Sequence, residues 1–144
     1  MLPEERDQAL VLDIISAAED ILGFIKGCDY ESFSENKMLR YAVERQLLVI
    51  GEAAKGLSDS FRSSLPEIPW KAVIGLRNII AHDYGEILTE RIWLVASRDL
   101  SGLLQKLSSF SDIPWYGSNF FIVGVARRES PMSNRSSSPI SRAL

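Results

Sequence analysis

Several residue types and patterns are scarce in this chain of 144 residues, and each shortage excludes a class of protein. Cys28 is the only cysteine, so an intrachain disulfide and a four-cysteine zinc site are excluded, and a reducing compartment is indicated. The uncharged apolar segment FFIVGVA at 120–126 is far too short to span a bilayer. The acidic start, MLPEERDQAL, lacks the basic beginning of a secretory signal. We therefore expect a cytoplasmic protein that does not enter a membrane.

Positive charge is also scarce. The chain has 16 Lys and Arg against 19 Asp and Glu, and the net charge of −3 excludes a strongly basic nucleic-acid-binding protein. The charge is uneven, because residues 1–112 hold 12 basic and 18 acidic residues (−6) whereas residues 113–144 hold four Arg and one Glu (+3). Chemistry on RNA is still compatible with this balance, since it needs positive charge only where phosphate lies.

Apolar residues recur at helical spacing in most of the chain up to about residue 107, and sustained period-two alternation is absent. A first helix is expected to begin at Pro3, before a run of acidic residues, and to stop near Gly27. A second long helix is expected from Ser34 to Leu57. Within it, Gly51 has a low helix propensity and would allow a neighbouring helix to approach closely.

The next segment is punctuated by serine and proline. Ser58 or Ser60 is expected to cap a short turn, and Pro69 suits the first turn of a third helix. Thr89 is expected to cap the following helix, with Glu90 in its first turn. The sequence therefore predicts an all-α fold, an antiparallel bundle of four to five helices.

The composition changes near residue 111. We expect a helical domain at 1–110 and an atypical C-terminal extension at 111–144. Residues 130–144, rich in serine, proline and arginine, are expected to be disordered. The segment NFFIVGV at 119–125 could form a short strand or an adhesive surface, but an extension without function is the simpler interpretation.

Polar residues cluster in GLRNIIAHDYGEI at 75–87, which holds the only histidine. If residues 75–84 form one helix, Asn78 and His82 share a face, and Arg77 and Tyr84 nearly eclipse. Arg77 and His82 would then lie about 140° apart around the axis, so one straight helix does not aim both at one point. The arginine could curl round, the helix could end near His82, or a second copy could supply the partner across a two-fold axis.

These residue types suit metal-independent RNA cleavage. His82 would take the proton from a ribose 2′-hydroxyl, and Arg77 would hold the charge that grows on the phosphate. Asn78 or Asp83 could orient the imidazole or bind a phosphate oxygen. A purely structural interpretation also fits the spacing, with His82 as a helix cap, Arg77 and Asp83 as an ion pair, and Tyr84 at the edge of the core.

The motif RNIIAHDY resembles the Arg, four residues, His, one residue, Tyr signature of HepT-like ribonuclease toxins in the HEPN superfamily. The segment AVERQLLVIGEAAKGLS resembles the second helix of that family. IPWKAVIGLRNIIAHDYGEI and IWLVASRDLSGLLQKL are similar to its third and fourth helices. The three segments stand in the family's order, and the likeness covers most of residues 8–107.

The resemblance implies a two-fold homodimer with both motifs in a shared cleft, with Arg77 and His82 catalytic and Asn78 and Asp83 supporting. It implies a toxin of a type VII-like toxin–antitoxin pair that cuts RNA, whether tRNA or mRNA, without metal or another cofactor. The partner would be a minimal nucleotidyltransferase antitoxin that transfers AMP to Tyr84. Glu52 lies in a family-like segment and could approach the cleft, although a solvated charge on the helix face is the slightly favoured explanation.

Two other functions fit the sequence. The chain could be a non-catalytic HEPN module that docks a nucleotidyltransferase and is modified by it. It could also be a helical bundle with a structural role only.

Overall fold

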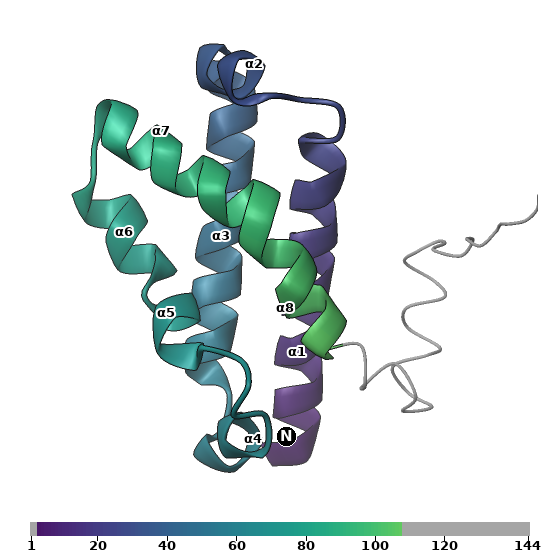
Figure 1. Ribbon diagram of the computed structural model, residues 1–144. Helices are drawn as coiled ribbons and strands as arrows, with labels where there is room; N and C mark the ends of the chain where they lie inside the picture. Colours follow the sequence, from purple (N-terminus) through teal and green to yellow (C-terminus); the bar gives the residue numbers. More distant parts are fainter. Residues whose placement is uncertain (1–2, 108–144) are drawn as a thin grey trace, which may run out of the picture. The chain divides into compact units, whose positions relative to one another are not determined.

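The computed structural model describes residues 3–107, and every regular element in that range is helical (Figure 1). The elements are α1 (Pro3–Phe24), α2 (Tyr30–Glu35), α3 (Lys37–Gly56), α4 (Asp59–Ser64), α5 (Trp70–Ile74), α6 (Leu76–His82), α7 (Gly85–Leu94), the π-helical turn η1 (Val95–Asp99) and α8 (Leu100–Leu107). Residues 3–107 contain no strand, so the predicted all-α bundle is confirmed. The expectations for residues 111–144 lie outside the described residues.

The two longest helices, α1 and α3, run in opposite directions side by side (Figure 1). The helices α7 and α8, joined by η1, form a nearly continuous rod that crosses in front of α3 and α1, while α5 and α6 pack mainly against α3. The core between these elements is almost wholly aliphatic. Its most deeply buried members include Val11, Ile14, Ile21, Val43, Leu47, Ile50, Ile92, Leu100 and Leu107. Each such side chain contributes about 1.5–3 kcal/mol by leaving water.

The predicted first helix is confirmed, since α1 begins at Pro3 and Gly27 follows its end with a φ of 79°, a conformation that suits glycine. The predicted start of the second helix at Ser34 is wrong. Ser34 belongs to the short helix α2, and α3 begins at Lys37. Asn36 separates them in an extended conformation, and its side-chain oxygen accepts a 3.0 Å hydrogen bond from the Leu39 amide.

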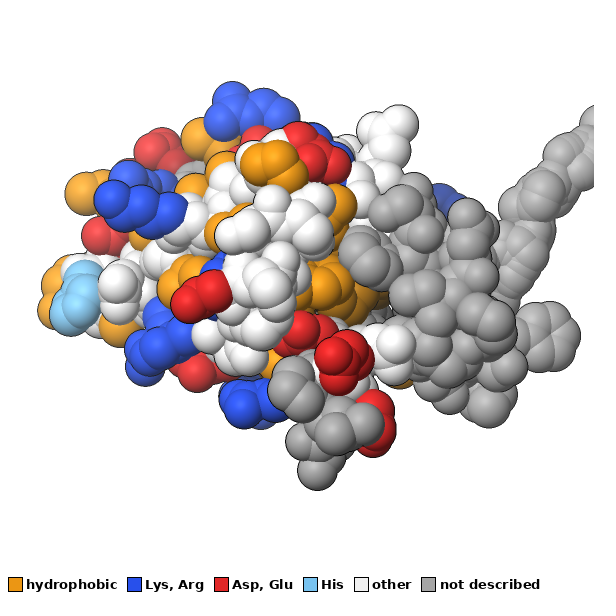
Figure 2. All heavy atoms as spheres, turned by 90° about the horizontal axis from the view of Figure 1, so that it is seen from below, with side chains coloured by type: hydrophobic (Ala, Val, Ile, Leu, Met, Phe, Trp, Pro, Cys, Tyr) orange, Lys and Arg blue, Asp and Glu red, His pale blue; other side chains and the backbone are white. Residues whose placement is uncertain are grey.

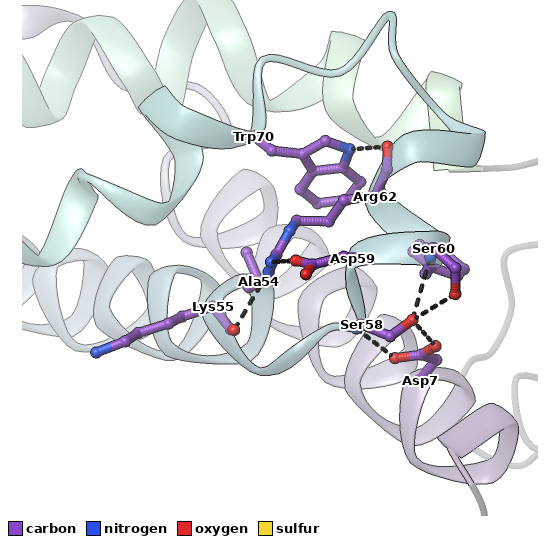
Figure 3. Close-up of polar contacts among 9 residues, drawn as sticks. Asp7, Ala54, Lys55, Ser58, Asp59, Ser60, Arg62 and Trp70 are labelled. Carbon is purple, nitrogen blue, oxygen red and sulfur yellow. Dashed lines mark hydrogen bonds and ion pairs between the residues drawn. The ribbon is translucent and has the colours of Figure 1, made fainter.

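Ser58 joins the lower end of α1 to the start of α4 (Figure 3). Its hydroxyl accepts a 3.1 Å hydrogen bond from the Phe61 amide, so the prediction that Ser58 caps a short helix is confirmed. The same hydroxyl donates to Asp7 at 2.7 Å, and the Ser58 amide donates to the other oxygen of that carboxylate at 2.9 Å. Asp7 is 9% exposed, and these two bonds satisfy its buried charge.

Arg62 of α4 links this helix to the end of α3 and to the start of α5. Its Nη1 donates to the carbonyl of Ala54 at 3.0 Å, near the end of α3, and its own carbonyl accepts a 3.0 Å hydrogen bond from the indole of Trp70 (Figure 3). Trp70 is buried at the start of α5, one residue after Pro69. This polar network holds α5 against α3, from which α6 then departs.

One helix does not run from Gly75 to Tyr84, and the alternative expectation that the helix ends near His82 is confirmed. The helix is interrupted at Gly75, which separates α5 from α6, and α6 ends at His82. Asp83 and Tyr84 are extended, with φ values of −95° and −134°. Arg77 and Tyr84 therefore do not eclipse on one helix.

The expected cap at Thr89 is also wrong. The helix α7 begins four residues earlier, at Gly85, whose φ of 56° lets the extended chain turn into the helix. Thr89 lies inside α7, where its hydroxyl donates back to the Gly85 carbonyl at 3.0 Å.

The described part of the chain, residues 3–107, contains no helix with the length and apolar character needed to cross a bilayer.

Candidate active site

Arg77 lies at the start of α6, where this helix comes closest to α3. A methyl group at Gly51 of α3 would lie 3.4 Å from the Arg77 amide nitrogen and 3.5 Å from the Val73 carbonyl oxygen. The expectation that Gly51 permits close helix approach is thus confirmed. Because the backbones meet here, the Arg77 side chain reaches Glu52, the next residue of α3, and its Nε lies 2.5 Å from the Glu52 carboxylate.

The Glu52 pair corrects one expectation from the sequence. Arg77 does not pair with Asp83. Asp83 accepts a 2.8 Å hydrogen bond from Nη1 of Arg91 instead, and Arg91 lies on α7. The Asp83–Arg91 pair closes the turn between α6 and α7, and the Arg77–Glu52 pair joins α6 to α3. Both pairs are partly exposed, so each contributes at most about 1 kcal/mol to stability, and their larger effect is to orient the side chains.

His82 is the last residue of α6, and its side chain is exposed. In a view from below, the single histidine stands open at the edge of the surface, and basic and acidic side chains are interspersed over that face (Figure 2). Asn78, one helical turn earlier, is exposed as well. Within residues 3–107, no hydrogen bond joins the side chains of Asn78 and His82. The imidazole is therefore open to an incoming substrate.

Tyr84 is 80% exposed. It precedes α7 as its N-cap and makes no side-chain capping bond. Its extended backbone, between the end of α6 and Gly85, presents the ring to solvent instead of the core edge. The hydroxyl is consequently accessible to an enzyme that would modify it.

The structure thus places Arg77, Asn78, His82 and Tyr84 on one side of the bundle, all exposed, along α6 and the turn that follows it. Sequence reasoning left Glu52 undecided and did not pair it with Arg77. Its position directly after Gly51 was the available signal. In the described part of the chain, no group of three or more His, Cys, Asp or Glu side chains has the arrangement of a metal site.

Comparisons with known proteins agree with one another. A family described as ribonuclease HepT-like matches residues 14–110. The chain is 42% identical over 93 residues to "Putative RNase MJ1380" of Methanocaldococcus jannaschii, covering 65% of this chain and 85% of that protein. It is 33% identical over 94 residues to "Probable ribonuclease HepT" of Thermococcus cleftensis, covering 65% and 86%. No solved structure gives a significant match.

Proposed function

The chain belongs to the HepT-like ribonuclease family, and from this premise we propose that it is a metal-independent RNA endonuclease and the toxin of a toxin–antitoxin pair. The observation that carries the proposal is the exposure of Arg77 and His82 on one seven-residue helix, with the arginine oriented by Glu52. A histidine with a structural role would be packed within the bundle, whereas the side chain of His82 is exposed. The guanidinium of Arg77 is oriented by its contact with Glu52 and stays partly exposed.

The reaction is transfer of the phosphodiester to the neighbouring 2′-oxygen. His82 takes the proton of the ribose 2′-hydroxyl, the 2′-oxygen attacks phosphorus, and the bond to the next nucleotide's 5′-oxygen breaks. The products are a 2′,3′-cyclic phosphate and a 5′-hydroxyl, and an imidazolium donates the proton that this hydroxyl acquires. Negative charge grows on the two non-bridging phosphate oxygens during attack, and a guanidinium is suited to hold it.

The Arg77–Glu52 pair supports this role. Glu52 contacts Nε, so the terminal Nη groups of Arg77 can turn toward a phosphate. A long, exposed arginine otherwise samples many rotamers, and fixing one of its nitrogens reduces the entropy lost when the substrate binds. Glu52 is therefore a positioning residue in the proposal, and it does not contact the reacting atoms.

We place the complete site in a two-fold dimer, because one protomer supplies a single imidazole and the reaction moves two protons. Exposed apolar side chains follow the motif on α7, Ile87 at 64% and Leu94 at 43%. Water is excluded when such side chains pack against a second copy, which supplies a driving force for the dimer. Two copies of α6 would then bring two His82 side chains to one phosphodiester.

The proposed silencing reaction uses the exposed Tyr84 hydroxyl. A nucleotidyltransferase partner would join this oxygen to the α-phosphorus of ATP, releasing pyrophosphate and the phenolic proton. The added AMP carries negative charge two residues from His82, and it repels and blocks the RNA backbone.

A mixing experiment tests the nuclease and the composite site together. Purified Arg77→Ala and His82→Ala proteins are each expected to be inactive on RNA in EDTA. Because each proposed site uses the His82 side chains of both protomers, subunit exchange between wild-type and His82→Ala protein should inactivate the mixed dimers and lower activity below the wild-type fraction. Arg98→Ala, another exposed arginine, on η1, is the matched control and should cut RNA at the wild-type rate.

The main alternative is a non-catalytic module whose only chemistry is to receive AMP on Tyr84. It is separated from the nuclease by intact mass after co-expression with the neighbouring nucleotidyltransferase gene, together with the RNA assay. AMP addition that Tyr84→Phe abolishes, from a protein that never cuts RNA, would replace the nuclease proposal with this one.

A further inference from the structure

A pocket of about 660 Å³ opens beside Tyr84, on the upper side of the bundle in Figure 1. It lies between the end of α2, the first turns of α3, and the connection from α6 to α7. Its walls include Tyr30 and Ser34 of α2, Arg40, Tyr41 and Glu44 of α3, and Ala81, Asp83, Tyr84 and Glu86 around the connection. None of the motif's chemistry described above uses this space.

The pocket contains a polar group without a partner. The Tyr30 hydroxyl is buried and has no hydrogen-bond partner among the described residues. Its ring is fixed by an edge contact with Trp93, the two ring centroids lying 6.2 Å apart, so the hydroxyl cannot easily swing out to water. A buried hydroxyl left unpaired costs about 1–3 kcal/mol, and because this oxygen is shielded from solvent, a ligand in the open pocket would meet the Tyr30 ring and not its hydroxyl.

Glu44 adds a partly desolvated acceptor. Burial raises the pKa of its carboxyl group, and the positive charge of Arg40 opposes that rise. Arg40 itself donates a 2.5 Å hydrogen bond to the Ser34 carbonyl, which ties it to the end of α2. The pocket therefore offers an acceptor in Glu44 that gains most from a ligand carrying N–H groups.

The charge of the pocket argues against an anionic ligand. Arg40 is its only basic residue among those that line it, and three acidic residues, Glu44, Asp83 and Glu86, face it. Two of the three tyrosines that line the pocket, Tyr41 and Tyr84, are 55% and 80% exposed and provide flat aromatic surfaces. A neutral, planar molecule with N–H donors fits this lining, and a phosphate does not.

The position of the pocket links it to α6. Ala81, Asp83 and Tyr84 line it, and they flank His82 in the chain. On α3, Glu44 and Glu52 are eight residues apart, which is about 12 Å along the axis and about 80° around it. The pocket and the Arg77–Glu52 pair therefore lie at two ends of the stretch of α3 that faces α6.

We propose that this pocket binds one unpaired nucleobase of a single-stranded RNA whose phosphodiester lies at His82. The inference rests on the proposed RNA substrate and specifies it as single-stranded. The base stacks on the Tyr41 and Tyr84 rings, and Glu44 accepts a hydrogen bond from an exocyclic amino group. Uracil lacks such a group and is the base that the pocket binds least well.

Binding is measured on the His82→Ala protein, so that substrate is not consumed and the outcome does not depend on cleavage. The probe is a fluorescein-labelled 12-nucleotide single strand of cytosine or uracil bases, read by anisotropy. Tyr41→Ala is expected to weaken binding of the cytosine strand roughly 10-fold, because stacking of one base contributes that much. Tyr41→Phe keeps the ring and should bind as the parent does. Glu35→Gln, an exposed acid on α2 that does not line the pocket, is the control for charge.

The difference in affinity between the cytosine and uracil strands tests the pocket more specifically than the affinity for one strand does. The parent should prefer the cytosine strand to the uracil strand, and Glu44→Gln should remove that preference, because an amide can both donate and accept. Equal affinity for both strands in the parent, or a Tyr41→Ala protein that binds like the parent, would overturn the pocket assignment. If either of these two results is found for a protein whose His82 is needed for RNA cleavage, the base-binding proposal is refuted and the nuclease proposal is kept. If the wild-type protein does not cut RNA but the cytosine preference is found, the nuclease proposal is refuted and the base-binding proposal is kept.

Discussion

The α1–α3 pair and the segment from α5 to α7 are built in opposite ways. The pair consists of two helices of 22 and 20 residues joined by side chains that are almost completely buried. The segment divides 25 residues, 70–94, into three helices of five, seven and ten residues, and its α6 buries only Leu76 fully. Regular helices secure the fold, whereas helix ends and turns expose Arg77, His82 and Tyr84.

This contrast indicates which residues can be substituted to change activity without unfolding the protein. A side chain at the end of a short helix contributes few contacts to the bundle, so selection can choose it for reactivity. A side chain between α1 and α3 has no such freedom, because its volume is matched by its neighbours. Activity and stability should therefore respond to different substitutions.

His82→Ala tests this contrast with the largest expected effect, which is on activity and not on stability. Loss of the proposed general base should lower the rate of RNA cleavage by about 10²- to 10⁴-fold. The unfolding free energy should change by less than about 0.5 kcal/mol, since the imidazole is exposed. Cleavage of a defined RNA in EDTA and urea unfolding of the same preparation measure the two effects. A mutant that cuts at the wild-type rate would refute the assigned role.

Leu47→Ala is expected to do the reverse. Leu47 is 1% exposed in the core of α3, and its truncation should cost about 2–5 kcal/mol of stability through lost burial and the cavity left behind. The matched control is Met38→Ala on the same helix, where the side chain is 83% exposed and the cost should stay below about 0.5 kcal/mol. Urea midpoints compare the two, and similar midpoints would show that α3 does not anchor the fold.

Ser58→Ala tests the polar end of the bundle. The substitution removes both the cap on α4 and the 2.7 Å bond to the buried Asp7 carboxylate, so a loss of about 1–2 kcal/mol is expected. Thermal unfolding followed by circular dichroism measures it. Ser63→Ala, at an exposed position of α4 outside this network, serves as the control and should be nearly silent. If the two variants melt together, the Asp7 bond contributes nothing.

Gly51→Ala should have the smallest effect among these substitutions, and it tests how closely α3 approaches α6. Its methyl group would sit 3.4 Å from the Arg77 amide, an ordinary contact, while helix propensity improves by up to about 1 kcal/mol. The net change in unfolding free energy should stay within about 1 kcal/mol. Gly51→Leu, by contrast, has no room and should push α6 and Arg77 away, lowering cleavage more than stability. Retention of full cleavage by the leucine variant would argue against the close approach.

The fold was predictable wherever buried residues repeat at helical spacing. The stripes of α1 and α3 are regular, and the caps at Ser58 and Gly27 follow from local chemistry. The break at Gly75 was not predicted, because apolar residues continue on both sides of it. The second helix was expected to begin at Ser34, and the capping role of Asn36 was overlooked. Asn36 carries a capping side chain in a position that the pattern alone assigns to a helix interior.

The spacing of the motif is the basis for proposing Arg77, His82 and Tyr84 as site residues, and their roles stay predictions. The assumption of one helix misplaced Tyr84 relative to Arg77. The turn between α6 and α7 depends on the positive φ of Gly85. A sequence shows that a glycine is present, but it does not show which dihedral angles that glycine adopts. The Arg77–Glu52 pair depends on two helices that meet at Gly51, which is tertiary information.

The π-helical turn η1 has a consequence for insertions and deletions in this chain. The Leu100 amide donates to the Val95 carbonyl, five residues back, so this turn holds one residue more than an α-helical turn. Removing Ser97, which is exposed, would let the same turn close with four-residue bonds while Ile92 and Leu100 kept their places in the core. In the rod that spans the bundle, this turn is the place where chain length can vary by one without rotating the apolar faces on either side.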